Sequence, residues 1–178
     1  MANKNLFPTF DKWTIINGGD TSDITDSLVI SENGYGCSFT VTHESSYLRL
    51  RIQDNAIKEI AGHTLLLHVD NFTSTDNEPK IALRVYTDLE NSVYTTTNLT
   101  YEDVLNMMPL DYEFTVPADC QRLDIRFSHD YASQGIDPPA TLVIENVSLI
   151  DTYTENLTTL NFHKVLEENL PASVTPGT

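Results

Sequence analysis

Hydrophobic and polar residues alternate along most of this chain, in short runs. Alternation with a period of two indicates β-strands that bury one face and expose the other. The runs are rich in Val, Ile, Leu, Thr, Phe and Tyr, and turn-forming pairs such as Asn33-Gly34 and Asp137-Pro138 separate them. We predict ten strands, over residues 13–17, 27–31, 36–43, 47–53, 64–72, 80–87, 92–97, 112–116, 122–129 and 140–151.

Many short strands at this spacing predict an all-β sandwich or barrel. Two segments interrupt the alternation. Residues 56–61 predict a helical turn closed by Gly62, and residues 101–108 predict another that ends at Pro109. Neither is long enough to be the crossover helix of a parallel sheet.

The pattern changes after residue 152. Phe162, Val165, Leu166 and Leu170 follow helical spacing, and Pro171 ends that helix. We therefore divide the chain into a β domain over residues 1–152 and a C-terminal helix with linker over 153–178. The helix either docks on the sandwich or tethers a neighbouring domain or subunit, and the pattern leaves both open.

The chain is acidic, with 26 Asp and Glu against 10 Lys and Arg and a formal net charge of −16. Nucleic acids and anionic membranes attract basic surfaces, so we expect neither as a partner. Such a charge suits solubility and packing in an assembly, or binding of calcium or a cationic partner.

The start of the chain has no apolar run, so we expect no signal peptide, and no apolar stretch is long enough to span a membrane.

The common catalytic motifs are missing from the sequence. It contains no phosphate-binding Gly-x-x-x-x-Gly-Lys loop, no Gly-x-Gly-x-x-Gly, no Gly-x-Ser-x-Gly and no His-Glu-x-x-His. Cys37 and Cys120 match no zinc spacing, and Cys37 is expected to be a buried apolar residue. We predict that the chain is not an enzyme. A saccharide hydrolase with two facing carboxylates is the distant alternative.

The five arginines of the chain all fall on predicted strands, at positions opposite the apolar face. Arg offers a planar fork of donors, Tyr offers a flat face for a sugar ring, and Asp accepts hydroxyl hydrogen bonds. This pattern predicts either a binding face for a hydroxyl-rich or anionic polymer, or a ladder of ion pairs that only solvates the sheet. The candidate ligand-binding residues on the three strands are Tyr47, Arg49, Arg51, Arg84, Tyr86, Arg122, Asp124 and Arg126.

Four segments carry a family resemblance: residues 5–14 (NLFPTFDKWT), 47–51 (YLRLR), 112–119 (YEFTVPAD) and 144–149 (IENVSL). Over residues 5–151 the chain resembles jelly-roll carbohydrate-binding modules of glycoside hydrolases and of tail or baseplate proteins of tailed bacteriophages. The resemblance implies two stacked antiparallel sheets. It also implies that glycan binds the concave sheet or the loops at one end, and that strands 47–53, 80–87 and 122–129 share a sheet.

Further site residues follow from the resemblance. Family members often hold a structural calcium ion, for which Asp11, Asp20 and Asp151 are candidates by position. Trp13 is expected in the core. Tyr131, in a loop after a strand end, joins the expected binding residues. With Trp13 in the core, the residues expected to stack on sugar rings are Tyr35, Tyr86, Tyr94 or Tyr131.

The sequence therefore predicts a non-catalytic glycan-binding module of a phage tail or baseplate protein that recognises host cell-wall saccharide. We expect it in the virion, assembled in the host cytoplasm, with the host polysaccharide and other virion subunits as partners. The alternative is a structural tail, baseplate or decoration module that makes protein–protein contacts.

Overall fold

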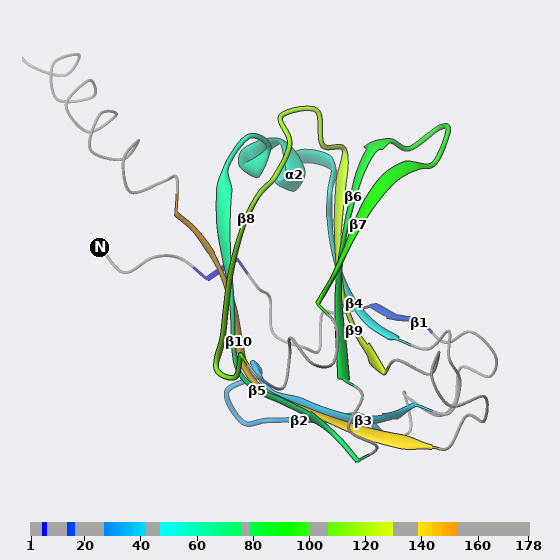
Figure 1. The fold of residues 1–178 in the computed structure, drawn as a ribbon, viewed down its shortest axis with the longest axis vertical. Helices are drawn as coiled ribbons and strands as arrows, with labels where there is room; N and C mark the ends of the chain where they lie inside the picture. The colour runs from blue at the N-terminus through cyan, green and yellow to red at the C-terminus, as the bar shows by residue number, and fades with distance from the viewer. Residues whose placement is uncertain are drawn as a thin grey trace, which may run out of the picture.

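The computed structural model describes residues 5–6, 14–16, 27–41, 47–75, 79–99, 107–129 and 139–152. These residues form two antiparallel β-sheets packed face to face, as Figure 1 shows. The predicted all-β sandwich of the jelly-roll type is confirmed.

One sheet has the strand order β1-β4-β9-β6-β7. We call it the arginine sheet, because all five arginines of the chain lie on its strands. Its strands are β1 (Thr14–Ile16), β4 (Tyr47–Gln53), β9 (Arg122–His129), β6 (Pro79–Asp88) and β7 (Val93–Leu99).

The other sheet has the order β2-β3-β10-β5-β8. Its strands carry five carboxylates and no Lys or Arg, so we call it the acidic sheet. The strands are β2 (Val29–Ile30), β3 (Cys37–Val41), β10 (Ala140–Asp151), β5 (Thr64–Ser74) and β8 (Leu110–Thr115). Helix α2 (Asp54–Ile60) connects β4 to β5 and buries Ile57 and Ile60 at one end of the sandwich.

The core lies between the sheets and follows the alternation along each strand. Apolar residues at every second position are buried, since a strand points successive side chains to opposite faces. Phe127 of β9 meets Phe72 of β5 edge to face, with ring centroids 5.3 Å apart, and so joins the two layers. The largest fully buried side chains are Phe39, Phe72, Phe127, Leu48, Leu65, Leu67, Ile81, Leu110, Leu123 and Ile125.

Each of the ten predicted strands overlaps an observed strand, and β4, β9 and β10 have the predicted bounds. The predicted turn over 56–61 is α2, and Gly62 follows it with φ +84°, a conformation that favours glycine. The predicted turn over 101–108 lies mostly outside the described residues. So do Trp13 and the C-terminal segment 153–178, so those predictions stand untested. No helix in the described part of the chain has the length and apolar character needed to cross a membrane.

Candidate functional site

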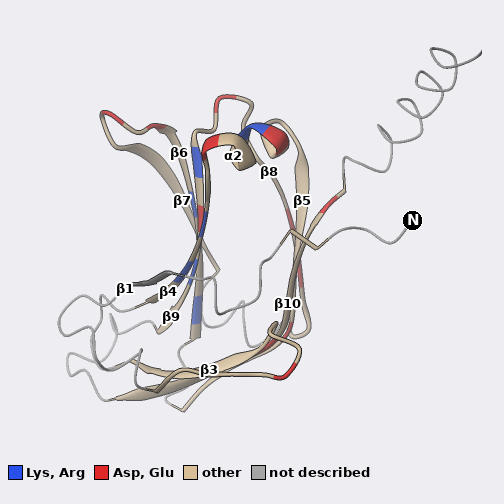
Figure 2. Cartoon of the chain, turned by 180° about the vertical axis from the view of Figure 1, so that it is seen from behind, with Lys and Arg blue, Asp and Glu red and all other residues tan. Residues whose placement is uncertain are grey.

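Strand β9 lies between β4 and β6, and this order gathers the arginines. Arg49 lies opposite Arg126, and Arg51 lies opposite Asp124, which in turn lies opposite Arg84. Figure 2 shows the basic residues along these strands. The prediction that the three arginine-bearing strands share one sheet is confirmed. We call this surface the arginine face, made of Arg49, Arg51, Arg84, Arg122, Arg126, Asp124, Tyr47, Tyr86 and Tyr94.

Asp124 is the centre of the arginine face and is fully buried. Arg51 donates Nε to its Oδ1 at 2.8 Å and Nη2 to its Oδ2 at 2.9 Å, a parallel two-bond arrangement. Arg126 donates Nη2 to Oδ2 at 3.3 Å. The guanidinium groups of Arg49 and Arg122 lie 3.9 and 3.8 Å from its oxygens. One carboxylate therefore organises four cations.

The pKa values follow from this arrangement. Burial alone would raise the pKa of Asp124, but the hydrogen bonds and charge of Arg51, with the charges of Arg49 and Arg122, bring it below the usual value. The hydrogen bonds to Asp124 raise the pKa of Arg51. Burial and the like charge of Arg51 lower the pKa of Arg49. Asp124 thus stays ionised at neutral pH.

Three tyrosines pack against the arginines. The guanidinium carbon of Arg122 lies 3.6 Å from the ring centroid of Tyr86. Arg84 lies over Tyr94 and Arg126 over Tyr47, each at 4.4 Å. Cation–π contacts of this kind attract each guanidinium group to the face of its tyrosine ring.

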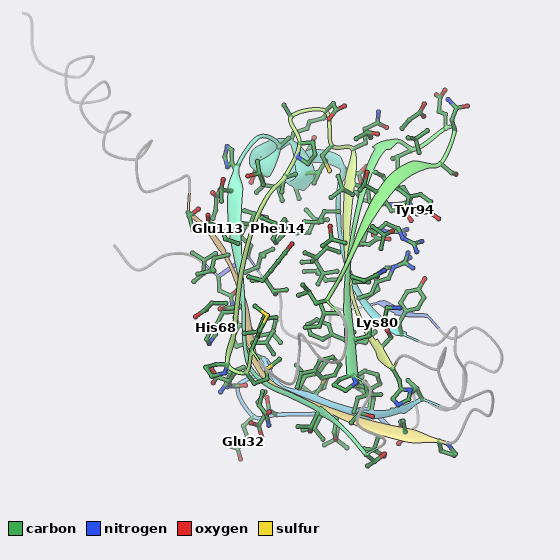
Figure 3. The ribbon with its side chains drawn as sticks, in the orientation of Figure 1. Glu32, His68, Lys80, Tyr94, Glu113 and Phe114 are labelled. Atoms are coloured by element: carbon green, nitrogen blue, oxygen red, sulfur yellow. The ribbon has the colours of Figure 1, made fainter. Side chains whose placement is uncertain are left out.

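The tyrosines differ in exposure. Tyr86 is only 6% exposed and lies beneath Arg122, so it supports that side chain. Tyr94 is 46% exposed and lies 5.0 Å from Tyr86 between ring centroids. Figure 3 shows Tyr94 and Lys80 on the outer side of the arginine sheet. Among the described tyrosines of the face, Tyr94 offers the most ring surface to a ligand.

Within the described residues, the positive charge of the arginine face is not balanced locally. Among the described residues, Asp124 alone contributes a carboxylate within 4 Å of any of the five guanidinium groups. Arg84 has no described carboxylate at that distance. The Nε atoms of Arg49, Arg84, Arg122 and Arg126 are buried, and no described group accepts a hydrogen bond from them. A simple ladder of one-to-one ion pairs would not leave this excess.

The proposed calcium ligands are not brought together by the described residues. Asp151 is buried at the end of β10, where its Oδ2 lies 2.7 Å from Nδ1 of His63. In the described ranges, no three His, Cys, Asp or Glu side chains form a group able to hold a metal ion. Asp11, Asp20 and Tyr131 lie outside those ranges. The described residues therefore give the calcium site no support, and it remains a prediction.

The acidic sheet carries a polar network that the sequence analysis did not predict. Nδ1 of His68 lies 2.7 Å from Oδ1 of Asp111, and Nε2 lies 2.7 Å from Oδ1 of Asp70. The network continues through Asn146, whose φ of 47° marks an irregular position in β10, to Asn33. The alternation of β5 puts His68 and Asp70 on one face. The contact with Asp111 depends on the pairing of β5 with β8.

Comparison with solved structures bears on the fold. The xylan-binding module CBM15 superposes with a TM-score of 0.52 at 12% identity, over 84% of this chain and 95% of that chain. The chain therefore shares the β-sandwich fold of that module. Xylanase10C from Cellvibrio japonicus, solved with xylopentaose, gives a TM-score of 0.50 at 11% identity, over 84% of this chain and 28% of that chain. This chain thus spans little more than a quarter of that xylanase.

The enzymatically active domain of tailspike protein 4 from bacteriophage CBA120 superposes with a TM-score of 0.45 at 14% identity, over 80% of this chain and 20% of that chain. No family model matches the sequence. No curated protein matches it either. The likeness to solved structures therefore describes the fold, and the ligand has to be inferred from the site.

Proposed function

We propose that this chain is a non-catalytic module that binds a glycan on the arginine face. The observation that carries the proposal is the gathering of five arginines and three tyrosines on one side of a single sheet, around the buried Asp124. The carbohydrate-binding-module fold supports it, since CBM15 is named for binding xylan.

The geometry suits a chain of sugar rings. Guanidinium groups present fixed, forked donors to hydroxyl or carboxylate oxygens, and Arg51 and Arg126 are already held in place by Asp124. The exposed ring of Tyr94 offers an apolar platform of the type on which sugar rings stack. Because these side chains are ordered by protein contacts, binding would cost little further conformational entropy.

The same geometry argues against hydrolysis at this face. Glycoside hydrolysis with general acid catalysis uses two carboxyl groups on either side of the scissile bond. Asp124 is buried and bound by Arg51, and its pKa lies below the usual value, so it is a poor proton donor at neutral pH. The non-catalytic assignment rests on this argument.

We also propose the setting: a tail or baseplate protein of a tailed phage that recognises host cell-wall saccharide. The support is the resemblance of residues 5–14 and of the three later segments to modules of that kind. Many copies on one virion would turn weak binding at each site into firm attachment.

Binding of purified chain to host cell-wall fractions and to an array of glycans tests the proposal, with and without a calcium chelator. Arg84→Ala and Tyr94→Ala are expected to weaken binding at least tenfold with an unchanged urea midpoint. Lys58→Ala, which removes an exposed cation on α2 that is not part of the arginine face, is the control. Wild-type affinity in both face variants would remove the arginine face as the site. A wild-type chain that binds no glycan would refute the function.

A second candidate function is a structural virion module that contacts other copies or subunits. It is favoured by the opposite charges of the two sheets, because a basic face on one copy complements an acidic face on another. Light scattering after size-exclusion chromatography distinguishes the two. An oligomer that dissociates at high salt and ignores every glycan would support the structural role.

A further inference from the structure

The charge of the arginine face is out of keeping with the rest of the chain. The whole protein has a net charge of −16, and the acidic sheet has five carboxylates on its strands without one Lys or Arg. All the Lys and Arg residues on described strands lie in the arginine sheet: the five arginines and Lys80. Neutral sugars do not need such a concentration of cations.

The clustering of arginines on this face destabilises the protein when no ligand is bound. Four of the five guanidinium groups share the carboxylate of Asp124 within 4 Å, and Arg84 has no described carboxylate at that distance. Burial and the like charge of Arg51 already lower the pKa of Arg49. Four buried Nε groups lack a described acceptor, and unsatisfied buried donors destabilise a fold. Surfaces that lower stability in this way are commonly those that bind a ligand. An anion is the ligand that would relieve the repulsion.

Arg84 and Arg122 form the best-defined binding site for that anion. Nη1 of Arg84 donates to Oη of Tyr86 at 3.5 Å, a long contact that leaves much of its donor capacity unused. Arg122 lies 3.6 Å above the ring of the same tyrosine. Together, Arg84 and Arg122 lower the pKa of Tyr86 against the opposing effect of burial, so both cations act at one point of the surface. The exposed Tyr94 lies beside it.

We propose that the ligand of the arginine face is an acidic polysaccharide, whose carboxylate or phosphate group binds between Arg84 and Arg122 while the adjoining sugar ring stacks on Tyr94. The inference rests on the proposed function and narrows its ligand class. Both kinds of oxyanion offer the paired oxygens that a guanidinium fork binds with two hydrogen bonds.

A nucleic acid is also a polyanion with rings that stack. It is the less favoured occupant, because nucleic-acid-binding domains are basic overall and their affinity depends on many phosphate contacts. A long duplex would extend past the arginine face and meet the rest of the protein, which has a strong negative charge. A glycan with spaced acidic sugars needs only the local basic patch.

Calorimetric titration with four polymers, compared at the same ionic strength and then repeated at higher salt, tests the inference. They are polygalacturonate, the same polymer after reduction of its carboxyl groups, a phosphorylated mannan and a single-stranded oligonucleotide. We expect at least one of the two acidic glycans to bind at least tenfold more tightly than the reduced polymer, with an affinity that falls between 50 and 300 mM salt. Which of the two binds better identifies the oxyanion.

Arg84→Gln and Arg122→Gln should each abolish the preference for the acidic polymer, whereas Lys58→Gln, with the same charge change on α2, should keep it. Urea midpoints report whether each variant is folded, and the salt dependence of the wild-type chain tests the inference without any variant.

Equal binding of acidic and reduced polymers would overturn the acidic ligand but leave a glycan-binding function. Binding of none of the glycans would overturn both. Tighter binding of the oligonucleotide than of either acidic glycan would also overturn the inference.

Discussion

Arg51 and Asp124 form a two-bond ion pair across β4 and β9, with donor–acceptor distances of 2.8 and 2.9 Å. The Asp124 side chain is fully buried, and the Arg51 side chain is 26% exposed. Because three further arginines approach the same carboxylate, Asp124 is the counter-charge on which the packing of this surface depends.

We predict that Asp124→Asn destabilises the domain by about 3 kcal/mol or more, since removing one member of a buried ion pair leaves its partner charge uncompensated. Urea unfolding measures the change. Glu113→Gln, an exposed carboxylate on β8, is the control and should stay within about 0.5 kcal/mol of wild type. A loss below about 1 kcal/mol for Asp124→Asn would show that the arginines keep their places without it.

The same residue predicts acid sensitivity. The folded-state pKa of Asp124 lies below the unfolded value of about 3.9, so its stabilising contribution is present above that pH and is lost as pH falls through the folded pKa. The difference in unfolding free energy between wild type and Asp124→Asn should therefore shrink as pH decreases below about 4. A difference that is constant between neutral pH and strong acid would contradict the shift.

On the opposite sheet, His68 predicts the reverse dependence. Hydrogen bonds to Asp111 and then Asp70 raise its pKa despite partial burial, so its contribution is complete below the unfolded pKa of about 6.5 and is lost as pH rises through the folded pKa. Titration of its ring protons by NMR should give a pKa above that of a model histidine. Asp111→Asn should lower it, because a neutral amide oxygen replaces the charged carboxylate that accepts from the ring and favours its protonated form. An unchanged midpoint in that variant would contradict the assignment.

The two cysteines should be unreactive in the folded protein. Both are free and buried, and burial raises the pKa of Cys37 to about 12 and also raises that of Cys120. A thiolate is the reactive form, so a thiol reagent at pH 8 should label neither residue in the native state and both in urea. Rapid labelling of folded protein would mean that β3, which carries Cys37, or the segment around Cys120 between β8 and β9 opens.

Several features of the face followed from the order of residues along single strands. The alternation in Tyr47–Gln53 and Arg122–His129 places their arginines opposite the core, because every second side chain points the same way. It also predicts the buried Leu48, Leu50 and Ile125. These are local consequences of strand geometry, and the sequence by itself determined them, along with the acidic character of the chain and the all-β class.

Only the tertiary structure decided what those side chains meet. Pairing of β9 with both β4 and β6 joins residues 73 positions apart, such as Arg51 and Asp124, and turns an outward carboxylate into a buried one. The same pairing of strands covers Tyr86 with Arg122 and leaves Tyr94 as the exposed ring. Strand order and register arise from contacts distant in sequence, which alternation within one strand does not encode.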